Sequence, residues 1–429
     1  MFGTGEVGLR SLSALLGTAT VPAAYAAADT FVTRRSALIA AALVAVSPLL
    51  VWYSQEARAY ALLVLLGTLS LVFFRQALAR GGRPLTWWAV SASLALATHY
   101  FAIFLVAAEG ALLLAGSASR RAVRWAVGTT TLVGAALAPL AVYQAENAEH
   151  TAWISNSVRL SGRVAYLLHQ LVVGVYPIDN IWPLVVAAPL VVLVGLLTWT
   201  EPRERTGALL VGSLGLVAVG GPLALAALGD AFFGGRGDYF IYRNLIVAVV
   251  PLTIAAAAAA GTASAGRAGS LVAAVACLLL VAVSIDIARR PELQRPDGRG
   301  VARALGPAPA GRAIVADIRT AAILKLYLPD AHEVARASVR ELAVIGEEGH
   351  PLAPSAAGFR QLQLAPVQML RLRGCARVSR DSSRHPNWRS SCRKVARSPC
   401  SSIRRGADPY ATLDERHQPR GRDPPGEAP

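Results

Sequence analysis

Long apolar runs separated by short polar links dominate the first two thirds of the chain. An apolar run of about 18 residues or more is typical of a helix that spans a bilayer. A backbone inside hydrocarbon satisfies its hydrogen bonds only as a helix or a closed barrel, and a barrel would need short alternating segments. The pattern therefore predicts an all-α polytopic membrane protein with about ten transmembrane helices. They cover residues 8–28, 36–52, 60–78, 86–98, 100–116, 123–143, 182–199, 207–228, 244–262 and 270–287.

Arginines in the links predict how these helices are oriented, because short links rich in Arg stay in the cytoplasm. The links carry Arg34, Arg35, Arg75, Arg80, Arg83, Arg120, Arg121, Arg124, Arg203, Arg205 and Arg267. All of them share one side only if residues 86–116 cross the bilayer twice. The run 86–98 is short for a span and is also compatible with a tilted or re-entrant piece. The extracytoplasmic side then receives residues 54–59, 99–100, 144–181, 229–243 and everything after about residue 288.

Composition agrees with a membrane protein and argues against nucleic-acid binding. Hydrophobic residues make up 54% of the chain and charged residues only 16%, whereas soluble domains carry about 25% charged residues. The formal net charge is +16, but most basic residues lie between apolar runs or in the C-terminal tail. No basic face with interleaved aromatic residues is present, so no nucleic-acid partner is expected.

Three segments follow from these shifts in composition. Residues 1–287 form the multi-pass membrane domain. Residues 288–370 have the character of a small extracytoplasmic α/β domain, with a strand expected at Ala313–Ile318 and a helix at Thr320–Tyr327. Residues 371–429 are rich in Arg, Ser and Pro and should be disordered, because they hold too few apolar residues for a core. Such a tail is also what an artefact of the reading frame would produce.

A dense polar turn between two apolar runs is the strongest local signal. It follows Pro48, which can bend the end of the incoming helix, and it carries Gln55, Glu56, Arg58 and Tyr60. The planar fork of an arginine suits a phosphate, and a carboxylate could orient that arginine or act as an acid or base. The alternative is a solvated loop with a local ion pair between Glu56 and Arg58, which would contribute little at a surface.

Two further positions combine polar side chains with predicted helix ends. His99 and Tyr100 interrupt a long apolar stretch, where polar residues usually face a cavity or a partner, unless Tyr100 only anchors the helix at the interface. Arg243 begins the run 244–262 and could neutralise a phosphate or extend toward lipid headgroups. No metal site is assigned, because the acids and histidines of the 144–181 loop are irregularly spaced. The cofactor, with a divalent metal as one possibility, and the oligomeric state stay open.

Several of these segments resemble the GT-C superfamily of membrane glycosyltransferases. The similarity is to the family 39 branch of protein-mannosyltransferase-like and aminoarabinose-transferase-like proteins, over about residues 1–335. Its most specific piece is Ser54-Gln55-Glu56-Ala57-Arg58-Ala59-Tyr60. The other pieces are Phe2-Gly3-Thr4-Gly5-Glu6 through Arg10-Ser11-Leu12-Ser13, Thr98-His99-Tyr100, Tyr242-Arg243-Asn244 and Arg295-Pro296-Asp297-Gly298-Arg299-Gly300-Val301-Ala302.

The resemblance implies transfer of a sugar from a polyprenyl-phosphate donor to an acceptor on the extracytoplasmic face of the cell membrane. A carboxylate would act as general base, and basic residues would hold the carrier phosphate. Glu56 is a weak candidate for the base, since the family places its acidic motif in a loop upstream of what corresponds to Met1. The resemblance therefore also implies an N-terminally truncated and inactive or impaired chain. The competing interpretations are a lipid-carrier flippase or transporter and a non-catalytic membrane scaffold.

Overall fold

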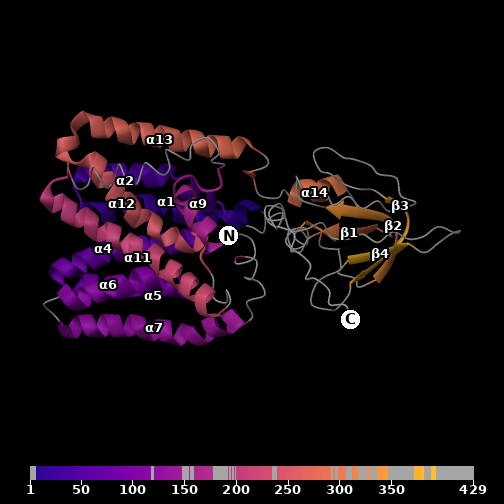
Figure 1. Cartoon of the computed structure of the whole chain (residues 1–429), viewed down its shortest axis with the longest axis horizontal. Helices are drawn as coiled ribbons and strands as arrows, with labels where there is room; N and C mark the ends of the chain where they lie inside the picture. Colours follow the sequence, from indigo (N-terminus) through magenta and orange to yellow (C-terminus); the bar gives the residue numbers. More distant parts are fainter. Residues whose placement is uncertain are drawn as a thin grey trace, which may run out of the picture. The chain divides into compact units, whose positions relative to one another are not determined.

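The computed structural model describes residues 6–116, 120–146, 159–176, 200–233, 239–290, 298–305, 312–316, 336–345, 372–380 and 388–392, with isolated positions between them. The described chain divides into two units, residues 1–293 and 294–429. The first unit is helical (Figure 1). Its helices are α1 (Glu6–Phe31), α2 (Arg34–Val46), α3 (Pro48–Ser54), α4 (Tyr60–Arg80), α5 (Arg83–Thr98), α6 (Ala102–Gly116), α7 (Arg120–Glu146), α9 (Leu160–Val173), α11 (Pro202–Phe233), η2 (Tyr242–Ala248), α12 (Val249–Gly261), η3 (Ala263–Ala265) and α13 (Gly266–Arg289).

The helical, multi-pass character of the first unit is confirmed. The predicted number of ten transmembrane helices is not confirmed. Among the described residues, six helices are long and apolar enough to cross a membrane, or seven if α2 and α3 form one bent span. Helices α5 and α6 have only 16 and 15 residues, and the turn at 99–101 separates them, as the sequence predicts. The predicted span 182–199 lies almost entirely outside the described residues.

The run 36–52, predicted as one span, is two helices that meet at an angle of 55°. Ser47 ends α2 and begins α3, and its hydroxyl accepts a hydrogen bond from the Leu50 amide at 3.5 Å. Pro48 occupies the first turn of α3, where its missing N–H and fixed φ are favourable. The bend therefore comes from the proline that the sequence marks, and it turns α3 away from the axis of α2.

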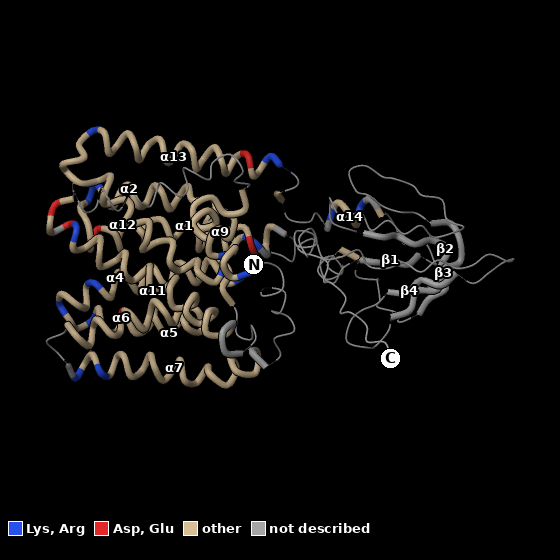
Figure 2. Tube along the Cα trace, viewed as in Figure 1, with Lys and Arg blue, Asp and Glu red and all other residues tan. Residues whose placement is uncertain are grey.

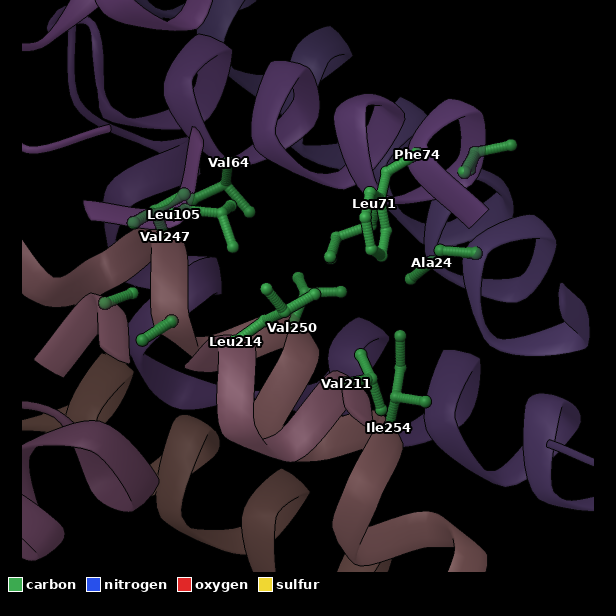
Figure 3. Close-up of a cluster of buried hydrophobic side chains, with 14 of the residues drawn as sticks. Ala24, Val64, Leu71, Phe74, Leu105, Val211, Leu214, Val247, Val250 and Ile254 are labelled. Carbon is green, nitrogen blue, oxygen red and sulfur yellow. The ribbon is translucent and has the colours of Figure 1, made fainter. Parts of the chain in front are cut away.

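Helices α4 and α12 form the centre of the first unit. The most apolar 18-residue stretch of the span Tyr60–Arg80 is 61% buried, and that of Tyr242–Gly261 is 67% buried, against 6% for the α7 span and 11% for the α13 span. Figure 3 shows Val64, Leu71 and Phe74 of α4 in the same cluster as Leu214 of α11 and Val250 of α12. The outer helices expose large apolar side chains such as Trp125 and Leu278, as expected of helices that face lipid.

A buried carboxylate holds three of these helices together. Glu109 of α6 is fully buried, and its Oε2 accepts a hydrogen bond from the indole N–H of Trp88 in α5 at 2.8 Å. Its Oε1 lies 3.0 Å from the hydroxyl of Ser70 in α4. Both carboxylate oxygens thus have partners, which a buried acid requires.

The arginine-rich links gather at one end of the helical unit, where a second polar cluster fastens them. Oε1 of Glu204, in the first turn of α11, accepts hydrogen bonds from the hydroxyls of Thr33 and Ser36 at 2.9 and 2.5 Å. Arg35 donates to the Gly266 carbonyl and to the Ser270 hydroxyl. Figure 2 shows most basic positions at the ends of the helices, with many at this end.

The second unit contains α14 (Gly298–Leu305) and a four-stranded sheet. The strands are β1 (Arg312–Ala316), β2 (Arg336–Ile345), β3 (Leu372–Arg380) and β4 (Trp388–Cys392), in the order β1-β2-β3-β4, with the first pair parallel and the other two antiparallel. Strand β1 overlaps the predicted strand Ala313–Ile318. Strands β3 and β4 lie inside the segment 371–429, for which composition predicts disorder. The division into 288–370 and 371–429 stays a prediction.

Candidate functional site

The polar turn predicted from sequence joins α3 to α4. Its backbone is closed by hydrogen bonds from the amides of Gln55 and Glu56 back to Trp52 and Tyr53, and from the Arg58 amide to the Glu56 carbonyl at 2.7 Å. Gln55 and Arg58 are exposed. Glu56 and Arg58 form the predicted ion pair, with 3.2 Å between Oε1 and Nε, and their side chains are 18% and 57% exposed. Such a pair contributes about 0–1 kcal/mol to stability, so it places two charges at the rim without fixing the turn.

Tyrosines on either side of this turn form the inner part of the site. Tyr53, the penultimate residue of α3, is buried, and its ring meets that of Tyr60 edge-on at 4.7 Å between centroids. Tyr53 also lies 6.4 Å from the ring of Tyr242, and the two phenols form a side-chain hydrogen bond. The charge of Glu56 acts on the Tyr53 phenol. The turn at 55–59 and the start of η2 therefore meet through Tyr53, a residue that no charge or motif in the sequence singles out.

His99 connects the turn between α5 and α6 to the same cluster. Its ring lies 5.8 Å from that of Tyr60 and 5.8 Å from that of Phe101, and its Nδ1 accepts a hydrogen bond from the Phe101 amide at 3.3 Å. Burial, and secondarily the positive charge of Arg243, lower the pKa of His99 below its ordinary value. The imidazole is therefore kept neutral at physiological pH. Tyr100, the adjacent predicted residue, is half-buried in the same turn.

Arg243 reaches the cluster from η2. The segment before it is held in place from two sides. The side-chain amide of Asn244 donates to the Tyr239 carbonyl at 2.7 Å, and the Arg163 side chain of α9 donates to the Phe240 carbonyl at 2.6 Å. Tyr239 also packs against Phe101, with 6.2 Å between ring centroids. These contacts bring the cation of Arg243 next to the imidazole of His99.

Three polar segments that are far apart in the sequence thus share one end of the helical unit. Tyr60, His99 and Arg243 lie together around Tyr53 and Tyr242, with Glu56 acting on the same cluster. Gln55 and Arg58 occupy the exposed rim of the turn. The name "tyrosine–arginine cluster" is used below for Tyr53, Tyr60, His99, Tyr242 and Arg243.

Metal binding has no support among the side chains that the structure describes. No group of three or more His, Cys, Asp or Glu residues in that part of the chain could hold an ion. His169, which the sequence places in a loop, lies in α9, and its Nε2 is 2.5 Å from the Tyr176 carbonyl. His150 and Asp179, which belong to the same predicted segment, lie outside the described residues.

The fold and this cluster define a polytopic helical membrane protein with a cation set among aromatic side chains at one end of its helices. Residues 1–143 match the family described as dolichyl-phosphate-mannose-protein mannosyltransferase. The match confirms the resemblance of the chain to the GT-C superfamily of membrane glycosyltransferases; the narrower branch stays a prediction. The matched residues include the turn at 55–59 and His99, but not Arg243.

Two solved structures were found to be similar, both of the oligosaccharyltransferase of Archaeoglobus fulgidus. One, a complex with zinc and sulfate, is 14% identical, covers 75% of this chain and 50% of its own, and has a TM-score of 0.38. The other, tethered to an acceptor peptide, is 12% identical, covers 75% and 48%, and has a TM-score of 0.34. The chain thus spans about half the length of these proteins. No curated protein matches it.

Proposed function

We propose that this chain transfers a sugar from a polyprenyl-phosphate donor to an acceptor in the cell envelope, which is a glycan, a lipid or a protein. The observation that carries the proposal is the meeting of Tyr60, His99 and Arg243 at one end of the helices. A lipid-phosphate donor requires a cationic site at the membrane surface, next to apolar helices that accept its chain. The tyrosine–arginine cluster has both properties.

Arg243 has the role of phosphate ligand in this proposal. Transfer breaks the bond between the anomeric carbon and a phosphate oxygen, so negative charge develops on the departing lipid phosphate. A guanidinium offers two parallel hydrogen bonds to such a group, and fixed charges that meet developing charge lower the barrier. The neutral imidazole of His99 adds no competing positive charge beside Arg243 and can hydrogen-bond to the donor.

The acceptor side requires a group that takes the proton of the attacking hydroxyl. Glu56 is the carboxylate of the turn at 55–59, and it is largely shielded while its partner Arg58 is exposed. The charge of Glu56 acts on the Tyr53 phenol of the cluster, and Glu56 is proposed as the general base. Arg58 and Gln55 are proposed to contact the donor or acceptor from the rim.

The positions of the cluster and of the arginine-rich links support an extracytoplasmic location for the cluster. The Arg-rich links near Arg35 and Glu204 lie at one end, and the tyrosine–arginine cluster lies at the other. The positive-inside rule places the arginine-rich end in the cytoplasm. A membrane-impermeant thiol reagent tests this in a variant without native cysteines: Ala57→Cys should react from outside the cell, and Ala263→Cys should react only after permeabilisation. The reverse result would contradict the orientation.

Activity is tested with the full chain in vesicles that contain a polyprenyl phosphate carrying a radiolabelled sugar, mannose in one series and a pentose in another. Transfer to a water-soluble or lipid acceptor should fall at least about tenfold in Arg243→Gln, which loses a charge-assisted contact. The matched control Arg267→Gln removes an exposed arginine at the other end and should transfer normally. Movement of unmodified donor across the bilayer without transfer would instead identify a lipid-carrier transporter.

A further inference from the structure

A pocket of about 310 Å³ opens between α1, α2, α3 and α4. Its apolar lining includes the branched side chains of Val21, Val44, Val51, Val64 and Ile246. Ile246 comes from η2, the helix that carries Arg243. The pocket therefore reaches from the side of the helical unit to the element that supplies the proposed phosphate ligand.

The pocket owes its shape to the bend at Ser47 and to a close helix contact. The bend carries α3 across α1, and Gly17 of α1 lies so close to α3 that an added Cβ would be 2.6 Å from the Cβ of Ser54. Gly17 and Ser54 both line the pocket. Because α3 leaves the axis of α2, a space stays open beside Val44 and Val51 that a continuous helix would have filled.

The threonine and serine hydroxyls of the wall are already satisfied inside their own helices. Those of Thr18, Thr20 and Ser54 donate to the carbonyls of Ala14, Leu16 and Val51 at 2.7 to 2.9 Å. A hydroxyl bonded in this way presents mainly its carbon atoms and has no free proton to offer a guest. The wall is thus suited to hydrocarbon rather than to a sugar.

One edge of the pocket faces the exterior of the helical unit. Thr18 of α1 and Ala45 of α2 line the pocket and are exposed, whereas Val44 and Val64 are buried. In a spanning helical unit this edge faces lipid. A chain can therefore enter from the bilayer without passing through water.

The inner end of the pocket reaches the tyrosine–arginine cluster. Tyr53 and Tyr60 line the pocket, and the same rings contact Tyr242 and His99. A lipid with its chain among the valines would therefore have its headgroup beside the side chains that lie next to Arg243. The apolar walls and the cationic end together match an anionic lipid.

We propose that this pocket binds the first part of the hydrocarbon chain of a single-chain lipid phosphate, an isoprenoid phosphate, with the phosphate at the tyrosine–arginine cluster. The volume lies at the low end of the range for small-molecule sites, about 300–1,000 Å³, and accommodates one chain rather than the two of a phospholipid. This assignment rests on the proposed function for the identity of the donor, but it concerns binding alone.

The test measures binding without sugar or acceptor, using the full chain in nanodiscs and a photoreactive isoprenoid phosphate of about 20 carbons. Ala45→Phe places a ring in the open edge of the pocket. Ala42→Phe is the matched control, because Ala42 is exposed on the same helix one turn earlier and does not line the pocket. Binding should weaken about tenfold or more in Ala45→Phe and stay unchanged in Ala42→Phe, and the label should map to α1 through α4.

Competition identifies the ligand chemistry. Unlabelled isoprenoid phosphate should displace the probe, whereas phosphatidic acid and inorganic phosphate should not. Equal affinity of Ala45→Phe and Ala42→Phe, labelling elsewhere, or equal displacement by phosphatidic acid would overturn the assignment. If the probe labels the pocket but the chain never transfers sugar, the proposed function is wrong and the pocket assignment stands. If Ala45→Phe transfers sugar as well as the wild type does, the pocket assignment is wrong and the proposed function stands.

Discussion

The rings of Tyr60 and His99 lie 5.8 Å apart and join two interhelical turns that the sequence separates by α4 and α5. Tyr60 begins α4, and His99 follows the last residue of α5. The contact shows that both turns occupy the same end of the helical unit. Because Arg243 acts on His99 as well, this pair is the point at which the three predicted site segments converge.

The state of His99 should make stability depend on pH. Its pKa is lowered in the folded chain by burial and by Arg243, so below about pH 6.5 the unfolded state takes up more protons than the folded state. Stability should therefore be constant for this group above that pH and should fall as the pH drops through the lowered pKa. Thermal unfolding of the wild type and of His99→Gln between pH 8 and 5 measures it. The variant should be less sensitive to acid, and identical profiles would contradict the role of His99.

Two substitutions of Tyr53 separate the contribution of its hydroxyl group to stability from that of its ring. Tyr53→Phe removes the hydrogen bond to Tyr242 and keeps the edge-on contact with Tyr60, so the loss should be about 1 kcal/mol of unfolding free energy. Tyr53→Leu also loses the aromatic contact, which contributes about 0.5–1.5 kcal/mol more. Denaturation midpoints of the two purified variants measure the difference. A Phe variant as stable as wild type would show that the phenol contact contributes nothing.

The contact between Gly17 and Ser54 predicts that a second substitution restores the stability lost in a first. Gly17→Ala places a methyl group 2.6 Å from the Ser54 Cβ, and such overpacking costs about 1–3 kcal/mol. Ser54→Gly removes that Cβ, so the double variant should regain much of the loss, a coupling that additive effects would not give. Gly128→Ala is the control, because an added Cβ there meets no atom within 4 Å. Equal losses in the single and double variants would argue against the contact.

Glu109 should tolerate an amide but not an apolar side chain. The Ser70 hydroxyl has one proton and lies within hydrogen-bonding distance of both the Gly67 carbonyl, at 2.8 Å, and Glu109. In Glu109→Gln the amide N–H can donate to Ser70 while the amide oxygen accepts from Trp88, so stability should be kept. Glu109→Leu leaves the buried indole N–H without a partner, at a cost of about 1–3 kcal/mol. Thermal unfolding distinguishes the two, and adding Trp88→Phe to Glu109→Leu should recover part of the loss.

The sequence alone determined the helical membrane character, the turn at 55–59, the break at Pro48 and the turn at His99. Each of these follows from local chemistry: apolar length, the missing amide of proline, or a polar pair between apolar runs. The number of spans stays a prediction, because α5 and α6 are shorter than a usual span and the predicted span 182–199 lies almost entirely outside the described residues.

The tertiary structure alone decided which helices are central and which side chains meet. Helices α4 and α7 are both apolar enough to span, yet one is mostly buried and the other mostly exposed. In a bilayer the face against lipid and the face against protein are both apolar, so helical periodicity does not distinguish them. The sequence could single out Tyr60, His99 and Arg243 by their polar side chains. It could not reveal Tyr53 at their centre or the pocket beside it, because both arise from the rotation and packing of helices that are distant in the chain.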